Sequence, residues 1–158
     1  MNFQRIKAFI CLLSLALLYT TAQAKWPARA PRGMVVSTHY LASQAGTEIL
    51  KKGGNAIDAA VATGFALAVV NPAAGNLGGG GFMVIRLADG KTTTFNYREK
   101  APLAAHEKMY LNEEGELIRN LNHKGYLSVG VPGTVAGFTM ALQKYGTMSI
   151  AEVVQPAI

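Results

Sequence analysis

The residues most able to do chemistry in this sequence are a run of glycines and an arginine that follows it. Residues 75–82 read Gly-Asn-Leu-Gly-Gly-Gly-Gly-Phe. Each glycine costs about 1 kcal/mol of backbone entropy relative to alanine, so such a run is expected where positive φ or a close approach requires it. Two interpretations stay open: a tight turn under a sheet, or a loop that lines a ligand pocket. A phosphate-binding loop is excluded, because no Lys-Ser/Thr follows and the glycines lead into a predicted strand.

Arg98 is the candidate ligand-binding side chain. It ends a predicted strand and is followed by Glu99. A guanidinium group binds a carboxylate through two parallel hydrogen bonds. The alternative is a solvated or ion-paired surface arginine, which is the commoner environment for this residue type. From the residue alone, both interpretations remain open.

Other reactive groups are scarce. The three histidines have no metal-ligand spacing, so we predict no metal site; they are His39, His106 and His123. Thr134, which follows Val131-Pro132-Gly133, resembles a helix cap more than a nucleophile.

The first 24 residues are predicted to be a cleaved signal peptide. Arg5 and Lys7 precede an apolar run over residues 8–18, and Ala22-Gln23-Ala24 has the small-x-small pattern of a cleavage site. A membrane anchor needs roughly 20 apolar residues, which is more than this run provides. Cleavage would remove Cys11, the only cysteine. We therefore expect a periplasmic or secreted chain without disulfides, free of the membrane after cleavage.

The remaining charge favours no particular macromolecular partner. The formal net charge is +6, but the basic residues are scattered and form no stripe with interleaved aromatic side chains. Nucleic-acid binding is therefore not expected. Residues 25–32, which contain two prolines, are predicted to be an exposed lead-in.

The elements that position these residues are predicted to alternate. Strands are expected at 33–38, 82–87, 92–98 and 127–131, and helices at about 41–52, 56–70 and 134–145. The second helix, which Asn55 caps with Asp58 in its first turn, is apolar on nearly every face and should be buried on several sides. A turn at 88–91 joins the middle strands into a hairpin. A hairpin after a buried helix favours a mixed α/β layered sheet over a doubly wound parallel one.

The last residues predict a helix that has only begun. Ser149-Ile150-Ala151-Glu152 is a capping box, and the sequence stops at Ile158, about two helical turns later, without a C-cap glycine. We expect a fragment cut inside a helix. We also expect that it does not fold alone, because strand edges would stay unpaired.

Four sequence blocks resemble the opening of gamma-glutamyltranspeptidases, in order and at family-like separations. They are residues 53–60, 76–82, 97–102 and 131–137, and the match runs from about Gly33 to the last residue. One block alone would be weak evidence, whereas four in order are highly specific. Residues 33–158 are therefore expected to be the N-terminal portion of the large subunit in this family.

The resemblance implies part of an N-terminal nucleophile hydrolase fold, a four-layer α/β/β/α sandwich that is incomplete here. In this family a precursor cleaves itself into a large and a small subunit. The new N-terminal threonine of the small subunit attacks the gamma-glutamyl carbonyl, and the acyl group passes to water, an amino acid or a peptide. The implied partners are glutathione, other gamma-glutamyl compounds and the small subunit of the same precursor, with no cofactor.

By position, the resemblance implies that Arg98 holds the α-carboxylate of the substrate. The threonine, the oxyanion glycines and the ligands of the substrate amino group lie on the small subunit. No catalytic residue is therefore expected in this sequence, and the chain by itself should be inactive. The alternatives are a related acylase or capsule-processing transpeptidase on the same scaffold, or an inactive truncated exported fragment.

Overall fold

The computed structural model describes residues 27–75 and 77–158, so the predicted signal peptide lies outside the described residues. The elements are α2 (Tyr40–Lys51), α3 (Ala56–Val70), β1 (Phe82–Arg86), β2 (Thr92–Asn96), η1 (Tyr126–Ser128), α4 (Thr134–Tyr145), α5 (Ile150–Val154) and η2 (Gln155–Ala157). Residues 27–32 are exposed, and the unit described below is Gly33–Ile158. No helix among the described residues combines the length and apolar character needed to span a membrane.

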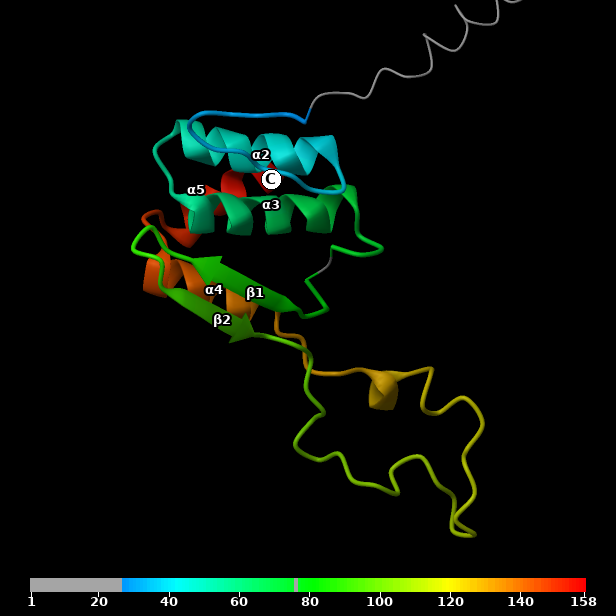
Figure 1. Cartoon of the computed structure of the whole chain (residues 1–158). Helices are drawn as coiled ribbons and strands as arrows, with labels where there is room; N and C mark the ends of the chain where they lie inside the picture. Colours follow the sequence, from blue (N-terminus) through cyan, green and yellow to red (C-terminus); the bar gives the residue numbers. More distant parts are fainter. Residues whose placement is uncertain (1–26, 76) are drawn as a thin grey trace, which may run out of the picture. The chain divides into compact units, whose positions relative to one another are not determined.

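Helices α2 and α3 lie side by side because glycine allows a close approach (Figure 1). A Cβ on Gly46 of α2 would stand 3.0 Å from the carbonyl oxygen of Ala59 in α3. The chain turns between the two helices at Gly53, whose φ of +94° is favourable only for glycine. Both helices begin and end within two residues of the positions that the sequence predicted.

Helix α3 is buried on several sides, which confirms the expectation from its uniformly apolar sequence. Its Phe65 meets Phe138 of α4 edge to face, with ring centroids 5.3 Å apart. Gly64 makes this contact possible, since a Cβ there would lie 2.6 Å from the Phe138 ring. Burying a phenylalanine contributes about 1.5–3 kcal/mol, so this contact is a main support of the core.

The N-terminus of α3 is tied to the loop between α4 and α5 by one buried carboxylate. Asn55 and Asp58 form a capping box, and Asp58 is fully buried. The Asp58 carboxylate accepts hydrogen bonds from the Thr147 backbone at 3.0 Å, the Thr147 hydroxyl at 2.6 Å and the Met148 backbone at 3.2 Å. Burial acts to raise the pKa of Asp58, but the Thr147 hydroxyl and the backbone N–H groups outweigh it and leave the pKa lowered.

Strands β1 and β2 form the predicted antiparallel hairpin, with Phe82 opposite Asn96 and Arg86 opposite Thr92. Ile85 and Phe95 are buried against Ile57 of α3 and Ala141 of α4. On the other face Val84 is 76% exposed. Helices thus cover one face of a two-stranded sheet, and the predicted mixed α/β class is confirmed.

Two predicted strands, 33–38 and 127–131, were wrong. Residues 33–38 form neither helix nor strand, and in 127–131 the chain has the end of η1 and a single antiparallel bridge between Val131 and Lys100. A strand requires a hydrogen-bonded neighbour, and the described residues offer neither segment a full one. The polar segment 101–130 is irregular apart from η1 and the bridge between Leu111 and Leu117 (Figure 1).

The capping box predicted at Ser149 is confirmed at the start of α5. The Ser149 hydroxyl accepts from the Glu152 backbone, and the Glu152 carboxylate accepts from the Ser149 backbone at 2.8 Å. The helix passes into η2 after Val154.

Candidate functional site

Arg98 lies on a short segment whose backbone is fixed at both ends. The strand ladder continues one residue pair past β2, with the Tyr97 N–H donating to the Gly81 carbonyl at 3.0 Å. Beyond it, the Val131 N–H donates to the Lys100 carbonyl at 2.8 Å. Between these points, the Arg98 N–H donates to the Asn96 side-chain oxygen at 3.1 Å. Arg98 therefore stands two residues beyond β2 rather than at its last residue, but its Cα is held firmly.

The Arg98 side chain has one charged contact within the described residues. Its Nε lies 3.3 Å from Oε2 of Glu99, and the Arg98 side chain is 58% exposed. The Glu99 oxygen is buried and makes no hydrogen bond to any described group. The pair is thus a loosely aligned ion pair, and it leaves most of the guanidinium donors available to a ligand.

Gly79 and Gly80, in the run before Phe82, make close contacts with distant parts of the chain. The carbonyl of Gly79 accepts hydrogen bonds from the Gly133 and Thr134 N–H groups at the start of α4, at 2.9 and 3.1 Å. A Cβ on Gly80 would lie 2.5 Å from the Tyr97 carbonyl oxygen and 2.7 Å from the Glu99 nitrogen. Gly79 and Gly80 are therefore needed for close approach, because they pack behind the Arg98 segment and against the start of α4.

Tyr97 is the centre of this packing. A Cβ on Gly137 of α4 would lie 2.5 Å from the Tyr97 Cβ, and one on Gly81 would lie 3.1 Å from the Tyr97 ring. Burial raises the pKa of Tyr97, whose hydroxyl donates to the Phe82 carbonyl at 3.3 Å. These contacts hold the end of β2 against α4, and Arg98 follows directly.

A pocket with a volume of about 240 Å³ opens beside Arg98, between the end of β2 and the first turns of α4. Its lining is mainly apolar and carries two cationic residues but no carboxylate; it consists of Phe95, Asn96, Tyr97, Arg98, Lys100, Val131, Pro132, Gly133, Ala136, Gly137 and Met140. A mainly apolar cavity with a few charged groups is typical of a ligand site for an anion with an apolar stem.

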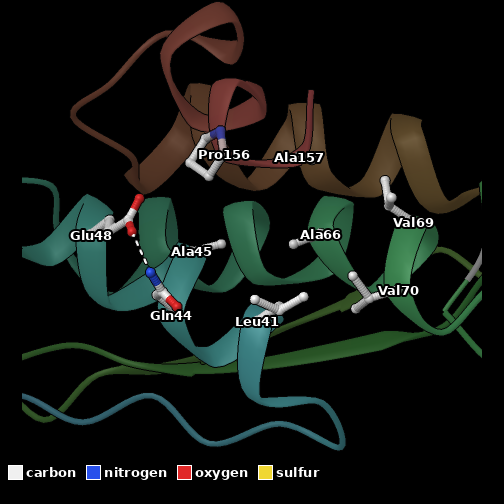
Figure 2. Close-up of a pocket in the computed structure, with 9 residues that line it drawn as sticks. All are labelled: Leu41, Gln44, Ala45, Glu48, Ala66, Val69, Val70, Pro156 and Ala157. Atoms are coloured by element: carbon white, nitrogen blue, oxygen red, sulfur yellow. Dashed lines mark hydrogen bonds between the residues drawn. The ribbon is translucent and has the colours of Figure 1, made fainter.

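A second cavity, with a volume of about 170 Å³, lies between α2, α3 and η2. Figure 2 shows its apolar walls, with Leu41, Val70 and Pro156 around it and Gln44 bonded to Glu48 at its edge. It contains no cationic residue, and none of its lining residues belongs to the Arg98 pocket. Its residues therefore indicate helix packing rather than anion binding.

Sequence reasoning missed several residues that shape the site. Tyr97 was not singled out, although its position just before Arg98, with Gly133 and Gly137 in the later block, was a usable signal. The cap prediction for Thr134 was wrong by one residue, because Gly133 is the N-cap of α4 and Thr134 is its buried first residue.

In the described part of the chain, no three His, Cys, Asp or Glu side chains gather closely enough to hold a metal ion.

Comparison with known proteins supports the resemblance. The model of the gamma-glutamyltranspeptidase family matches residues 42–158. A glutathione hydrolase proenzyme of Pseudomonas sp. (strain A14) is 56% identical over 146 residues, covering 92% of this chain and 25% of the relative. The glutathione hydrolase proenzyme of Escherichia coli (strain K12) is 55% identical over 131 residues, covering 83% of this chain and 23% of the relative.

The fold agrees with a solved member of the same group. The crystal structure of Helicobacter pylori gamma-glutamyltranspeptidase superposes with a TM-score of 0.78 at 52% identity, over 84% of this chain and 38% of that one. The chain described here belongs to the gamma-glutamyltranspeptidase family and has part of the N-terminal nucleophile hydrolase fold of that family. It spans about a quarter of the length of these two curated relatives.

Proposed function

We propose that this chain is part of a gamma-glutamyltransferase or glutathione hydrolase, and that Arg98 binds the α-carboxylate of the gamma-glutamyl donor. The observation that carries the proposal is the state of Arg98. Its backbone is held by hydrogen bonds on both sides, whereas its guanidinium is largely exposed at the edge of a pocket. An arginine with a fixed Cα and unused donors is suited to bidentate capture of a carboxylate. Family membership supports the choice of substrate class.

In this proposal the chain supplies binding and orientation, and the chemical step comes from the rest of the proenzyme. The nucleophile is the N-terminal threonine of the small subunit, with its own α-amine as base. Arg98 holds the amino-acid head of the donor so that the gamma-carbonyl is presented to that threonine. The partner is therefore the small subunit of the same precursor.

The direct test is steady-state kinetics of Arg98→Lys and Arg98→Ala in the processed two-subunit enzyme, with a gamma-glutamyl anilide as donor. The lysine variant keeps the charge but loses the planar fork, so we expect a raised KM. The alanine variant loses both the charge and the fork, so its kcat/KM should fall further, about 10- to 100-fold, since hydrogen bonds to charged groups contribute about 1.5–3 kcal/mol. A wild-type KM in both variants, with processing intact, would show that Arg98 is a structural residue.

A second donor separates this proposal from a related acylase. The glutaryl anilide has the same chain length as the glutamyl donor but lacks the α-amino group. Preference for the glutaryl compound in the wild-type enzyme contradicts the assignment to glutathione hydrolysis.

We also propose that the chain by itself is catalytically silent. Arg98 can position a carboxylate, but positioning alone performs no acyl transfer, because a nucleophile and an oxyanion site are needed as well. Purified residues 25–158 should release no aniline from the gamma-glutamyl anilide above the rate in buffer. Measurable release would contradict both this proposal and the assignment of the nucleophile to the small subunit.

Export is the remaining proposal. The charged start, the apolar run and the Ala-Gln-Ala site over residues 1–24 support a signal peptide and a periplasmic or secreted location. Mass spectrometry of the mature protein should find Lys25 as its first residue. A mature chain that retains the apolar run would instead indicate an anchored protein.

A further inference from the structure

The chain that leaves β2 alternates in exposure. Asn96, Arg98 and Lys100 are exposed, whereas Tyr97 and Glu99 are partly buried. Alternate side chains of an extended chain lie on opposite faces. The antiparallel bridge to Val131 shows that the chain is still extended at Lys100. Arg98 and Lys100 therefore lie on the same open face, with their Cα atoms about 7 Å apart.

Lys100 shares the pocket with Arg98 but has a different charge environment. Both residues line the cavity between β2 and α4, and the other lining residues are uncharged. The ion pairs within the described residues are Lys91 with Asp89 and Arg98 with Glu99, and Lys100 takes part in neither. Its backbone is fixed, with its N–H donating to the Val131 carbonyl at 3.1 Å and its carbonyl accepting at 2.8 Å. The pocket therefore has, beside the arginine, a lysine whose backbone is fixed and which takes part in neither of these ion pairs.

We infer that Lys100 recognises a second carboxylate, carried by the leaving group of the gamma-glutamyl donor. This inference rests on the proposed function. Glutathione has one carboxylate on its glutamyl head and another at its glycine end, on opposite sides of the gamma-amide bond. With Arg98 on the first carboxylate, Lys100 is the next cation on the same face and binds the second. Lys100 is thus a specificity residue that favours donors with an anionic leaving group.

A matched pair of chromogenic donors tests the inference in the processed enzyme. Gamma-glutamyl-4-nitroanilide has a neutral leaving group, and gamma-glutamyl-3-carboxy-4-nitroanilide adds one carboxylate to the same ring. Lys100→Met keeps the backbone bonds to Val131 and removes the charge. We expect it to raise KM about two- to fivefold for the carboxylated donor and to leave KM for the neutral donor unchanged, since exposed charge pairs contribute modestly.

Two further variants serve as controls. Lys100→Arg should keep the wild-type preference, because it restores the charge. Lys91→Met, in the hairpin turn, removes a lysine that is paired with Asp89 and is absent from the pocket lining, and it should change neither KM. If Lys100→Met gives no processed enzyme, Lys100→Gln and the salt dependence of the wild-type preference test the same charge, because salt screens exposed pairs.

The outcomes separate this inference from the proposed function. Equal effects of Lys100→Met on the two donors, or no effect on either, overturn the role of Lys100. Arg98→Ala should raise KM for both donors, because both carry the same glutamyl head. An unchanged KM in Arg98→Ala contradicts the proposed function, whatever Lys100 does.

Discussion

Two charged residues of this chain, Asp58 and Arg98, are held in opposite ways. Asp58 is fully buried, and its carboxylate accepts hydrogen bonds from Asn55, Thr147 and Met148. The Arg98 side chain is 58% exposed, and its charged contact within the described residues is the ion pair with Glu99. The Asp58 carboxylate oxygens accept hydrogen bonds from groups of the same chain, whereas most of the Arg98 guanidinium donors are available to a ligand.

The contrast separates stability from binding. A buried charge that is fully hydrogen-bonded stabilises one arrangement of the helices, because any displacement leaves it without partners. An exposed charge on a fixed backbone contributes little to stability but is available to a ligand. Substitution of Asp58 should therefore affect folding, and substitution of Arg98 should affect substrate binding.

The largest effect is expected for Asp58→Ala in the proenzyme. The change leaves the N–H groups of Thr147 and Met148 without their acceptor, which should lower the free energy of unfolding by about 3 kcal/mol or more. Thermal unfolding and soluble yield measure it. Asp89→Ala is the control, because Asp89 is an exposed carboxylate paired with Lys91 in the hairpin turn. Equal stability of Asp58→Ala and Asp89→Ala would show that Asp58 does not stabilise the fold.

The same carboxylate predicts a pH dependence. The pKa of Asp58 is lowered in the folded chain, so its stabilising contribution is present above the unfolded pKa of about 4 and is lost as the pH falls through the folded value. The stability difference between wild type and Asp58→Asn should therefore be constant from pH 7 to about 5 and shrink below about pH 4. Unfolding curves across this range measure the difference. A difference that grew in acid would contradict the sign of the shift.

An intermediate effect is expected for Gly137→Ala, which acts on the packing behind Arg98. The new Cβ would lie 2.5 Å from the Tyr97 Cβ, so α4 and β2 must move apart. Overpacking of this kind costs about 1–3 kcal/mol. The KM for the donor should rise as well, because the Arg98 segment follows Tyr97. Gln143→Ala, on an exposed position of the same helix, is the control for both measurements and should change neither.

The smallest effect on stability is expected for Arg98→Ala. Its exposed ion pair should contribute no more than about 0.5 kcal/mol to the free energy of unfolding, even though donor binding is weakened. Unfolding of the processed variant measures this directly. A loss comparable to that of Asp58→Ala would show that Arg98 supports the fold, and the comparison between the two residues would no longer hold.

Much of the local structure could be predicted because its causes lie within a few residues of each other. The Asn55 cap, the Ser149 capping box and the turn at 88–91 depend on neighbouring hydrogen bonds and on a backbone conformation that glycine adopts. The strands predicted at 33–38 and 127–131 failed for the opposite reason. Their β-branched residues permit an extended chain, but a strand needs a partner that lies elsewhere in the sequence.

The sequence by itself determined the helices, the hairpin, the mixed α/β class and, through four blocks in order, the family. Only the tertiary structure decided why the glycines are needed and what surrounds Arg98. The glycines face Tyr97 and Phe138 from distant parts of the chain, and Asp58 bonds to a loop 89 residues away. The pocket, in turn, exists because β2 meets α4. Contacts between residues so far apart depend on how the elements pack, and no local pattern of residues records that packing.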